Sequence, residues 1–268
     1  MEKVGLIAGE GEFPLKIANA LKEKNYFLSL IEISGFTNPE IRNFADEKIA
    51  VKLGQLQKTI KFLKKSDTRK VILAGRIKHT SVFSIKPDLL TIKILSKIPD
   101  KRAKSLLKAI CDEFEKNGIK VLSSVEPLKE FLAQEKVYTK RKPTKHELKD
   151  IEFGKKIARQ ITCLDIGQAV IVKDTTVVAV EAMEGTNKCI ERAGEIAGEG
   201  CVCVKFARPE QDFRFDVPVV GADTIQNLAK IKAKVLAIQK DLTLFLNPEK
   251  AIQIADENGI SIVGVARD

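Results

Sequence analysis

Aromatic residues are scarce in this sequence: they make up 6% of its 268 residues, and tryptophan is absent. Proteins that bind single-stranded nucleic acid without sequence preference usually stack its bases on aromatic side chains, so this class of function is disfavoured. Histidine is scarce as well, because His79 and His146 are the only two, and a histidine-rich metal site is excluded. No apolar run reaches about 18 residues, so no membrane-spanning helix is predicted.

Cysteine occurs five times, an odd number without regular spacing, and no secretory leader is recognisable. These features predict free thiols in a reduced cytoplasm. Cys201 and Cys203 stand two residues apart in the apolar run 201–204. We therefore expect them to be small core residues on one face of a strand.

Positive charge, in contrast, is in excess, and the formal net charge is +10. This excess favours an anionic partner: nucleic acid, a phosphorylated substrate or an anionic membrane surface. The lysines are spread along the chain, so the charge alone does not distinguish these three partners.

The first half begins with a strand at Val4–Ala8, a glycine-rich turn and a helix at Leu15–Lys24. This succession predicts the start of a Rossmann-like unit. Gly9 and Gly11 would let the backbone approach an anion at the helix N-terminus. The third glycine of a dinucleotide fingerprint is missing, and two glutamates in the turn would repel a pyrophosphate, so NAD binding is disfavoured. A plain tight turn and a loop that touches one end of a nucleotide both stay open.

A second candidate contact follows the buried strand Lys70–Ala74, which runs into a basic turn containing Lys78. Open α/β sheets place ligand contacts after such strands, although a solvated basic turn would have the same sequence. Strands and helices alternate up to residue 132, which predicts a parallel sheet with helices on its faces.

The chain is expected to be an α/β protein of two domains. Residues 134–149 are polar and basic and contain a proline, so they are predicted to be a linker. Residues 1–133 before it form the Rossmann-like N-terminal domain. Residues 150–268 after it contain further strands and helices and form a second, mixed α/β domain.

The most charged part of the second domain is the stretch 205–224, where two prolines nine residues apart prevent a continuous helix. Its alternation predicts a strand with Asp212, Arg214 and Asp216 on one face and the two intervening phenylalanines on the other. An arginine suits a phosphate, and carboxylates suit a hard cation. An edge strand with solvated charges would show the same pattern.

Acids and cations gather at the expected strand ends and turns of this domain. Such an arrangement suits metal-assisted phosphate chemistry, and it is also common on charged surfaces. The acids are Glu181, Glu184, Asp212, Asp216 and Asp223, and the cations are Lys173, Lys205, Arg208 and Arg214.

Several distinctive segments follow one another along nearly the whole chain: Gly5–Pro14, Ala74–Lys78, Leu164–Val172, Val180–Thr186, Gln211–Pro218, Gly221–Ile225 and Ala255–Gly264. In this order they resemble the LpxI-type UDP-2,3-diacylglucosamine pyrophosphatases of lipid A biosynthesis.

This resemblance implies two domains with a substrate cleft between them and hydrolysis that depends on Mg²⁺ or Mn²⁺. The products would be UMP and 2,3-diacylglucosamine 1-phosphate, formed when water attacks the sugar-side phosphorus. It also implies a cytoplasmic enzyme, peripheral on the inner membrane face, that binds no nucleic acid; a homodimer is among the expected assemblies.

The resemblance further suggests roles for individual residues. The family's essential aspartate maps to Asp212 or Asp216, and we favour Asp212, with Gln211 as a further catalytic residue. Substrate contacts are expected from Gly9, Gly11, Lys78, Lys205, Arg208, Arg214 and Thr186. Metal ligands are expected to be Asp212, Asp216, Glu184 and Asp223.

Three positions depart from the family pattern: Asn187 replaces an aspartate, His79-Thr80 replaces Arg-Pro, and residues 100–102 replace an acidic pair. An amide oxygen can still ligate Mg²⁺ but brings no charge, so weaker metal binding is one consequence. The alternatives are a pyrophosphatase of another nucleotide sugar and a non-catalytic nucleotide- or nucleic-acid-binding module.

Overall fold

A computed structural model describes residues 1–77, 87–98 and 103–267. These residues form two compact units. The first consists of Met1–Leu128 together with Asp212–Asp216, and the second of Lys129–Gln211 together with Val217–Asp268. The chain therefore passes from the second unit to the first after Gln211 and returns after Asp216. Lys78 and the departures at His79-Thr80 and residues 100–102 lie outside the described residues.

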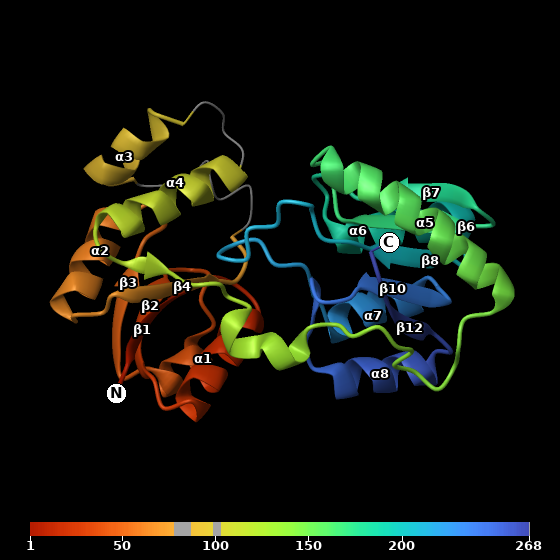
Figure 1. Ribbon diagram of the computed structural model, residues 1–268, viewed down its shortest axis with the longest axis horizontal. Helices are drawn as coiled ribbons and strands as arrows, with labels where there is room; N and C mark the ends of the chain where they lie inside the picture. Colours follow the sequence, from red (N-terminus) through yellow and green to blue (C-terminus); the bar gives the residue numbers. More distant parts are fainter. Residues whose placement is uncertain (78–86, 99–102, 268) are drawn as a thin grey trace. The chain divides into compact units, whose positions relative to one another are not determined.

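The first unit is built around a five-stranded parallel sheet in the order β3-β2-β1-β4-β5, which confirms the predicted Rossmann-like arrangement (Figure 1). Helix α1 packs on one face, while α2, α3 and α4 cover the other. The strands are β1 (Lys3–Ala8), β2 (Phe27–Ile33), β3 (Glu47–Val51), β4 (Lys70–Ala74) and β5 (Lys120–Val121). The helices are α1 (Phe13–Glu23), α2 (Leu56–Lys65), α3 (Leu89–Leu95) and α4 (Ala103–Lys116), with 3₁₀ turns at Pro39–Phe44 and Glu126–Phe131.

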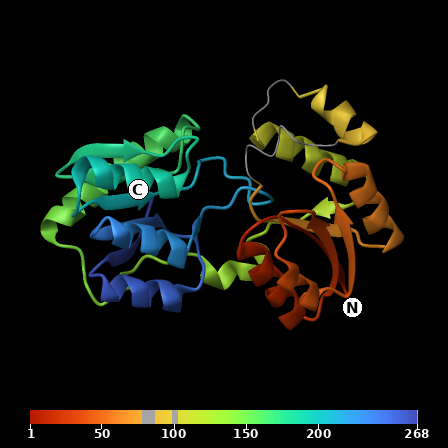
Figure 2. The same cartoon turned by 180° about the vertical axis from the view of Figure 1, so that it is seen from behind.

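The second unit contains a mixed five-stranded sheet in the order β12-β10-β8-β6-β7, seen from behind in Figure 2. Strands β8, β10 and β12 are parallel, whereas β6 is antiparallel to both of its neighbours. The strands are β6 (Ala169–Lys173), β7 (Thr176–Val180), β8 (Val202–Lys205), β10 (Val235–Gln239) and β12 (Ser261–Val265); a small sheet pairs β9 (Val219–Val220) with β11 (Leu244–Phe245). The helices are α5 (Lys145–Cys163), α6 (Thr186–Ala197), α7 (Ala222–Lys230) and α8 (Pro248–Glu257).

Alternating side chains divide the core of this unit into two layers, as the pleat of a strand requires. Val202 and Val204 pack against α5, whereas Cys203 lies in the cluster formed with α6, α7 and α8. Cys201 and Cys203 are fully buried, so the prediction that they are core residues is confirmed. Among the described residues, no helix is long and apolar enough to cross a membrane.

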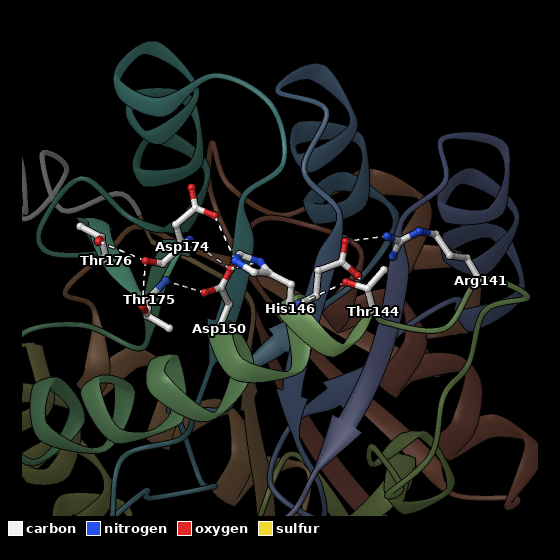
Figure 3. Close-up of polar contacts among 8 residues, drawn as sticks. Arg141, Thr144, His146, Asp150, Asp174, Thr175 and Thr176 are labelled. Atoms are coloured by element: carbon white, nitrogen blue, oxygen red, sulfur yellow. Dashed lines mark hydrogen bonds and ion pairs between the residues drawn. The ribbon is translucent and has the colours of Figure 1, made fainter.

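The stretch 134–149, predicted as a linker, belongs to the second unit and makes specific hydrogen bonds there. Arg141 Nη1 donates to Ser261 Oγ (2.8 Å) and its Nη2 donates to Glu147 Oε1 (2.5 Å). Helix α5 begins inside this stretch with a capping box between Thr144 and Glu147 (Figure 3). Specific hydrogen bonds thus join the predicted linker to the second unit.

The predicted strand through Asp212–Asp216 is wrong, because these residues form a turn. The backbone N–H groups of Phe215 and Asp216 donate to the carbonyl of Asp212, and the Asp212 side chain accepts the backbone N–H of Arg214. An aspartate that caps its own turn competes with strand pairing, and the flanking prolines cannot donate to a ladder. The five residues consequently do not show the predicted alternation of faces.

Candidate functional site

A buried lysine dominates the polar edge of the second unit. Lys205 ends β8 and is 7% exposed. Its Nζ donates to Thr186 Oγ1 (2.9 Å), and that hydroxyl in turn donates to Glu181 Oε1 (2.9 Å). Among the described residues, no carboxylate lies within ion-pair distance of Lys205, so its contact is the hydroxyl of Thr186.

Sheet topology explains why these residues meet. Strands β7 and β8 both run antiparallel to β6, so their carboxyl ends lie at the edge where β6 begins. Glu181 directly follows β7, Lys205 ends β8, and Gln168 directly precedes β6. Helix α6 also begins here with Thr186, and its N-cap residue is Gly185.

The electrostatics of this edge are unusual. Gly185 supplies no side-chain cap, so no capping side chain offsets the partial positive charge at the first turn of α6. The Lys205 ammonium is hydrogen-bonded to Thr186, the first residue of that helix, and two positive groups are therefore close together. The Glu181 carboxylate, one hydroxyl away, offsets part of this charge. An anion bound here would interact favourably with both the ammonium and the helix end.

Two glutamines extend the network. The backbone N–H of Gln168 donates to Glu181 Oε2 (3.2 Å), and Gln168 Nε2 donates to Gln211 Oε1 (3.3 Å). The same Gln211 oxygen accepts the backbone N–H of Arg208 (2.9 Å). The structure thus connects the predicted residues Gln211, Arg208, Thr186 and Lys205 through Gln168 and Glu181.

Sequence reasoning placed Glu181 among the acids at strand ends without giving it an individual role, and it did not single out Gln168. Both lie in the segments that resemble the LpxI-type enzymes, and both are polar residues that directly flank buried strands. Gly167 permits the close approach of these segments, because a Cβ there would lie 2.0 Å from the carbonyl oxygen of Glu181. Polar residues beside buried strands were therefore the signal that could have identified them.

The remaining predicted residues of the second unit are engaged differently. Arg208 forms an ion pair with Asp165 (2.5 Å). Glu184 accepts from Arg192 (2.7 Å) and from the backbone N–H of Ala182, and the Arg192 hydrogen bond lowers the pKa of this carboxyl. Asp223 is exposed in the first turn of α7.

Asp212 and Arg214 form a bidentate pair in the first unit. Arg214 Nε lies 3.0 Å from Asp212 Oδ1 and its Nη2 lies 2.8 Å from Oδ2, while Nη1 donates to Glu115 on α4 (2.9 Å). Phe215 packs against the core that α4 covers, and the carbonyl of Phe213 accepts from Ser124. Hydrogen bonds from Arg214 lower the pKa of Asp212, against the opposing effect of partial burial. The carboxylate therefore stays ionised at neutral pH.

Gly9 has a structural explanation in the first unit. A Cβ on Gly9 would lie 2.8 Å from the carbonyl oxygen of Arg76, and the backbone of Gly9 donates to Ala74. The turns after β1 and β4 thus pack backbone against backbone. Gly11 has φ 105°, a conformation that favours glycine. The predicted anion contact at these two glycines stays a prediction.

The predicted metal ligands belong to both units: Asp212 and Asp216 to the first, Glu184 and Asp223 to the second. Across the part of the chain that the structure describes, no three His, Cys, Asp or Glu side chains are grouped closely enough to hold a metal ion. Mg²⁺ is commonly bound by one or two carboxylates together with substrate phosphates and water. The donor chemistry of Asp212 and Asp216 fits that mode and does not provide a complete protein cage.

Comparison with known proteins gives matches along the chain. The LpxI N-terminal domain family matches residues 3–131, and the LpxI C-terminal domain family matches residues 134–263. The UDP-2,3-diacylglucosamine pyrophosphatase LpxI of Caulobacter vibrioides is 28% identical over 276 residues, covering 99% of this chain and 98% of the relative.

Solved structures show much weaker likeness. A UDP-glucose-4-epimerase of Stenotrophomonas maltophila is 9% identical with a TM-score of 0.29, and the match covers 44% of this chain and 34% of the epimerase. Glycinamide-RNase-transformylase T of Mycobacterium tuberculosis is 11% identical with a TM-score of 0.26, over 67% and 44% of the two chains. Neither carries an argument about function. The two domain matches, in contrast, extend over nearly the whole sequence, and the chain belongs to the LpxI family.

Proposed function

We propose that this protein hydrolyses the pyrophosphate bond of UDP-2,3-diacylglucosamine in lipid A biosynthesis, giving UMP and 2,3-diacylglucosamine 1-phosphate. Family membership over both domains and the activity named for the Caulobacter relative support the proposal. The observation that carries it is the buried Lys205 ammonium beside the N-terminus of α6. Such a site is suited to a phosphate group, which the substrate supplies twice.

In the proposed mechanism, Lys205 and the first turn of α6 bind a phosphoryl oxygen and stabilise the charge that develops on it. Thr186 orients the ammonium, because its hydroxyl accepts from Lys205 and donates to Glu181. Glu181 is itself fixed by the backbone of Gln168. These residues therefore bind and position the pyrophosphate rather than transfer protons.

Arg214 and Asp212 are proposed to act as a charged pair, Arg214 toward a phosphate and Asp212 toward a cation or the attacking water. The planar fork of Arg214 matches a phosphate. In the structure Asp212 binds two of its nitrogens and Glu115 binds the third, so a phosphate would replace one of these carboxylates. Because its pKa is lowered, the Asp212 carboxyl is ionised at neutral pH and is a weak general base there. It is thereby suited to hold a cation or orient the attacking water at the sugar-side phosphorus.

We also propose a requirement for Mg²⁺ or Mn²⁺, with Asp212 and Asp216 as the carboxylates that would contact it. When bound, such an ion neutralises charge on the phosphoryl oxygens. Carboxylates without a cluster of His or Cys suit hard cations of this kind. EDTA should abolish hydrolysis and either metal should restore it; full turnover in EDTA would disprove the requirement.

The expected location is the cytoplasmic face of the inner membrane, where a substrate with two acyl chains resides. The net charge of +10 supports reversible binding to anionic lipid. A homodimer is compatible with this proposal, and light scattering of the purified protein would measure its mass.

The activity is tested with UDP-2,3-diacylglucosamine in detergent micelles and Mg²⁺, with detection of UMP. In ¹⁸O-labelled water, the label should enter 2,3-diacylglucosamine 1-phosphate, because attack at the sugar-side phosphorus leaves UMP unlabelled. Label in UMP would contradict the proposed point of attack. Binding of UDP without release of UMP would indicate a non-catalytic module, and turnover of other nucleotide sugars alone would indicate a different substrate.

A further inference from the structure

Helix α3 carries an exposed apolar side. Leu89, Ile92 and Leu95 are 81%, 49% and 40% exposed, and their spacing of three residues aligns them along one side of the helix. The opposite side of α3, with Thr91 and Ile94, is buried. In the described part of the first unit, Met1 is the other large apolar side chain that is exposed. Exposed apolar side chains are therefore concentrated on α3.

Lysines lie on α3 and on the neighbouring helix α2. Helix α2, which packs against α3 (Figure 1), lines a groove of about 460 Å³ with Lys58, Lys61 and Lys65. The groove extends to Asp88, the residue directly before α3, whose carboxylate already accepts the backbone N–H groups of Gln57 and Thr91. The exposed Lys93 and Lys97 add positive charge within and just beyond α3. We call α3 together with the three lysines of α2 the α2–α3 surface.

We propose that the α2–α3 surface docks the protein on an anionic lipid bilayer. Leu89, Ile92 and Leu95 would enter the boundary between headgroups and acyl chains, and the lysines of the groove would lie against lipid phosphates. Apolar side chains flanked by lysines are characteristic of helices that lie in this interface. The proposal deepens the proposed function, since a diacylated substrate must be taken from a bilayer.

Charge complementarity selects the bilayer over a second copy of this chain. In a symmetric dimer the same patch contacts itself, which would bring one lysine-rich face against another. A stable dimer also requires about 800 Å² from each partner, more than a helix of seven residues offers. An anionic bilayer satisfies both the apolar side chains and the lysines.

The test measures binding of the full-length protein to vesicles without substrate. Vesicles of phosphatidylcholine alone are compared with vesicles that also contain anionic phosphatidylglycerol. We expect binding to the anionic vesicles, weakened by salt. Replacing Leu89 and Ile92 by serine should weaken binding by about tenfold or more, because both apolar contacts are lost. Replacing Lys61 and Lys65 by glutamine should weaken it by about fivefold per lysine.

Matched controls come from the second unit. Leu148→Ser with Ile196→Ser removes two apolar side chains of similar exposure, and Lys149→Gln with Lys250→Gln removes two exposed lysines. Both control proteins should bind as the unchanged protein does. Equal weakening by the controls, unchanged binding of the α2–α3 variants, or equal binding to both vesicle types would overturn the proposal. So would a concentration-dependent dimer that the Leu89/Ile92 variant abolishes.

A separate readout distinguishes docking from catalysis. With substrate in detergent micelles, the Leu89/Ile92 variant should release UMP at the normal rate, whereas with substrate in anionic vesicles its rate should fall by about the loss in binding. If neither the unchanged protein nor the Leu89/Ile92 variant releases UMP from micelles, the proposed function fails, while binding to vesicles still decides the docking proposal. The wild-type dependence on salt and on anionic lipid requires no variant, so misfolding cannot obscure it.

Discussion

Replacement of Lys205 by methionine should lower the rate of catalysis without lowering the free energy of unfolding. Lys205 is 7% exposed, and its ammonium is hydrogen-bonded to a hydroxyl; methionine retains the unbranched stem but removes the ammonium. Replacing a buried ion pair by apolar side chains is often neutral or stabilising by about 1–4 kcal/mol, whereas removing one partner of a pair is destabilising. Among the described residues Lys205 forms no direct ion pair, so its removal leaves no such partner behind. Thr186 still donates to Glu181 after the change, so no buried carboxylate loses that partner. We expect the free energy of unfolding to stay the same or rise by about 1–2 kcal/mol.

The effect on catalysis should have the opposite sign. If Lys205 stabilises charge on a phosphoryl oxygen, its loss should lower kcat by about 10²–10³-fold, the scale found for one preorganised donor. Urea unfolding is followed by circular dichroism, because the chain lacks tryptophan, and kcat is followed by UMP release from micelles. Thr186→Ser should keep most activity and Thr186→Val should not, since only serine preserves the hydroxyl.

Lys155 on α5 supplies the matched control. It is 5% exposed and pairs with Glu152 (3.1 Å) on its own helix. Lys155→Met should leave kcat unchanged and alter stability by less than about 1 kcal/mol, because Glu152 is largely solvated. A Lys205→Met protein that unfolds more easily by about 2 kcal/mol and yet turns over normally would refute the reasoning, because a structural role alone gives that result.

Three further predictions concern other parts of the molecule. Asp212→Asn should lower kcat by about 10²-fold or more, with Glu115→Gln as the milder control. The pKa of Asp212 is lowered, so its carboxyl stays ionised at neutral pH. The stability that the ionised carboxyl contributes should be lost only in acid, as pH falls below the usual aspartate pKa of about 3.9. Any change of rate between about pH 5 and 8 should therefore also be seen in Asp212→Asn. Asp150→Ala should lower the free energy of unfolding in urea by about 3 kcal/mol. The reason is that this buried carboxylate accepts the backbone N–H groups of Asp174 and Thr175 in the β6–β7 turn (Figure 3), and a loss under about 1 kcal/mol would contradict it. A thiol reagent should modify Cys163 rapidly in the folded protein, whereas the four buried cysteines should react only after unfolding, and burial raises the pKa of Cys111 and Cys189 to about 12.

Helices and strands could be predicted where the local sequence pattern matches the pattern of burial in the core. The sequence predicts a strand at Lys70–Ala74, and β4 has the same bounds; the strand predicted at Val4–Ala8 corresponds to β1, which begins one residue earlier. In α2, the buried residues repeat at helical spacing while lysines occupy the outer face, so periodicity and packing give the same answer. The early start of α5 was also readable, because Thr144 and Glu147 have the spacing of a capping box.

Other features depend on contacts that sequence spacing does not contain. The alternation at Asp212–Asp216 suggested a strand, but the Asp212 side chain binds the backbone of Arg214 and closes a turn. The meeting of Lys205 with Thr186 depends on β6 being antiparallel to β8, a pairing that the apolar pattern of either strand allows but does not require. Charged candidates could therefore be found from the sequence, whereas the way they combine could not.

The buried charges of the second unit differ in how they are satisfied. Glu147 binds Arg141 and caps α5, Asp150 closes the β6–β7 turn, and Lys155 pairs with Glu152. The contacts of these three residues are therefore explained by the stability of the fold. Lys205, in contrast, contacts a hydroxyl at the positive end of a helix, where a cation is disfavoured. The Glu181 carboxylate lies one hydroxyl away and offsets only part of the charge of Lys205. A bound anion would compensate the rest, so a phosphate at Lys205 should raise the free energy of unfolding of the protein.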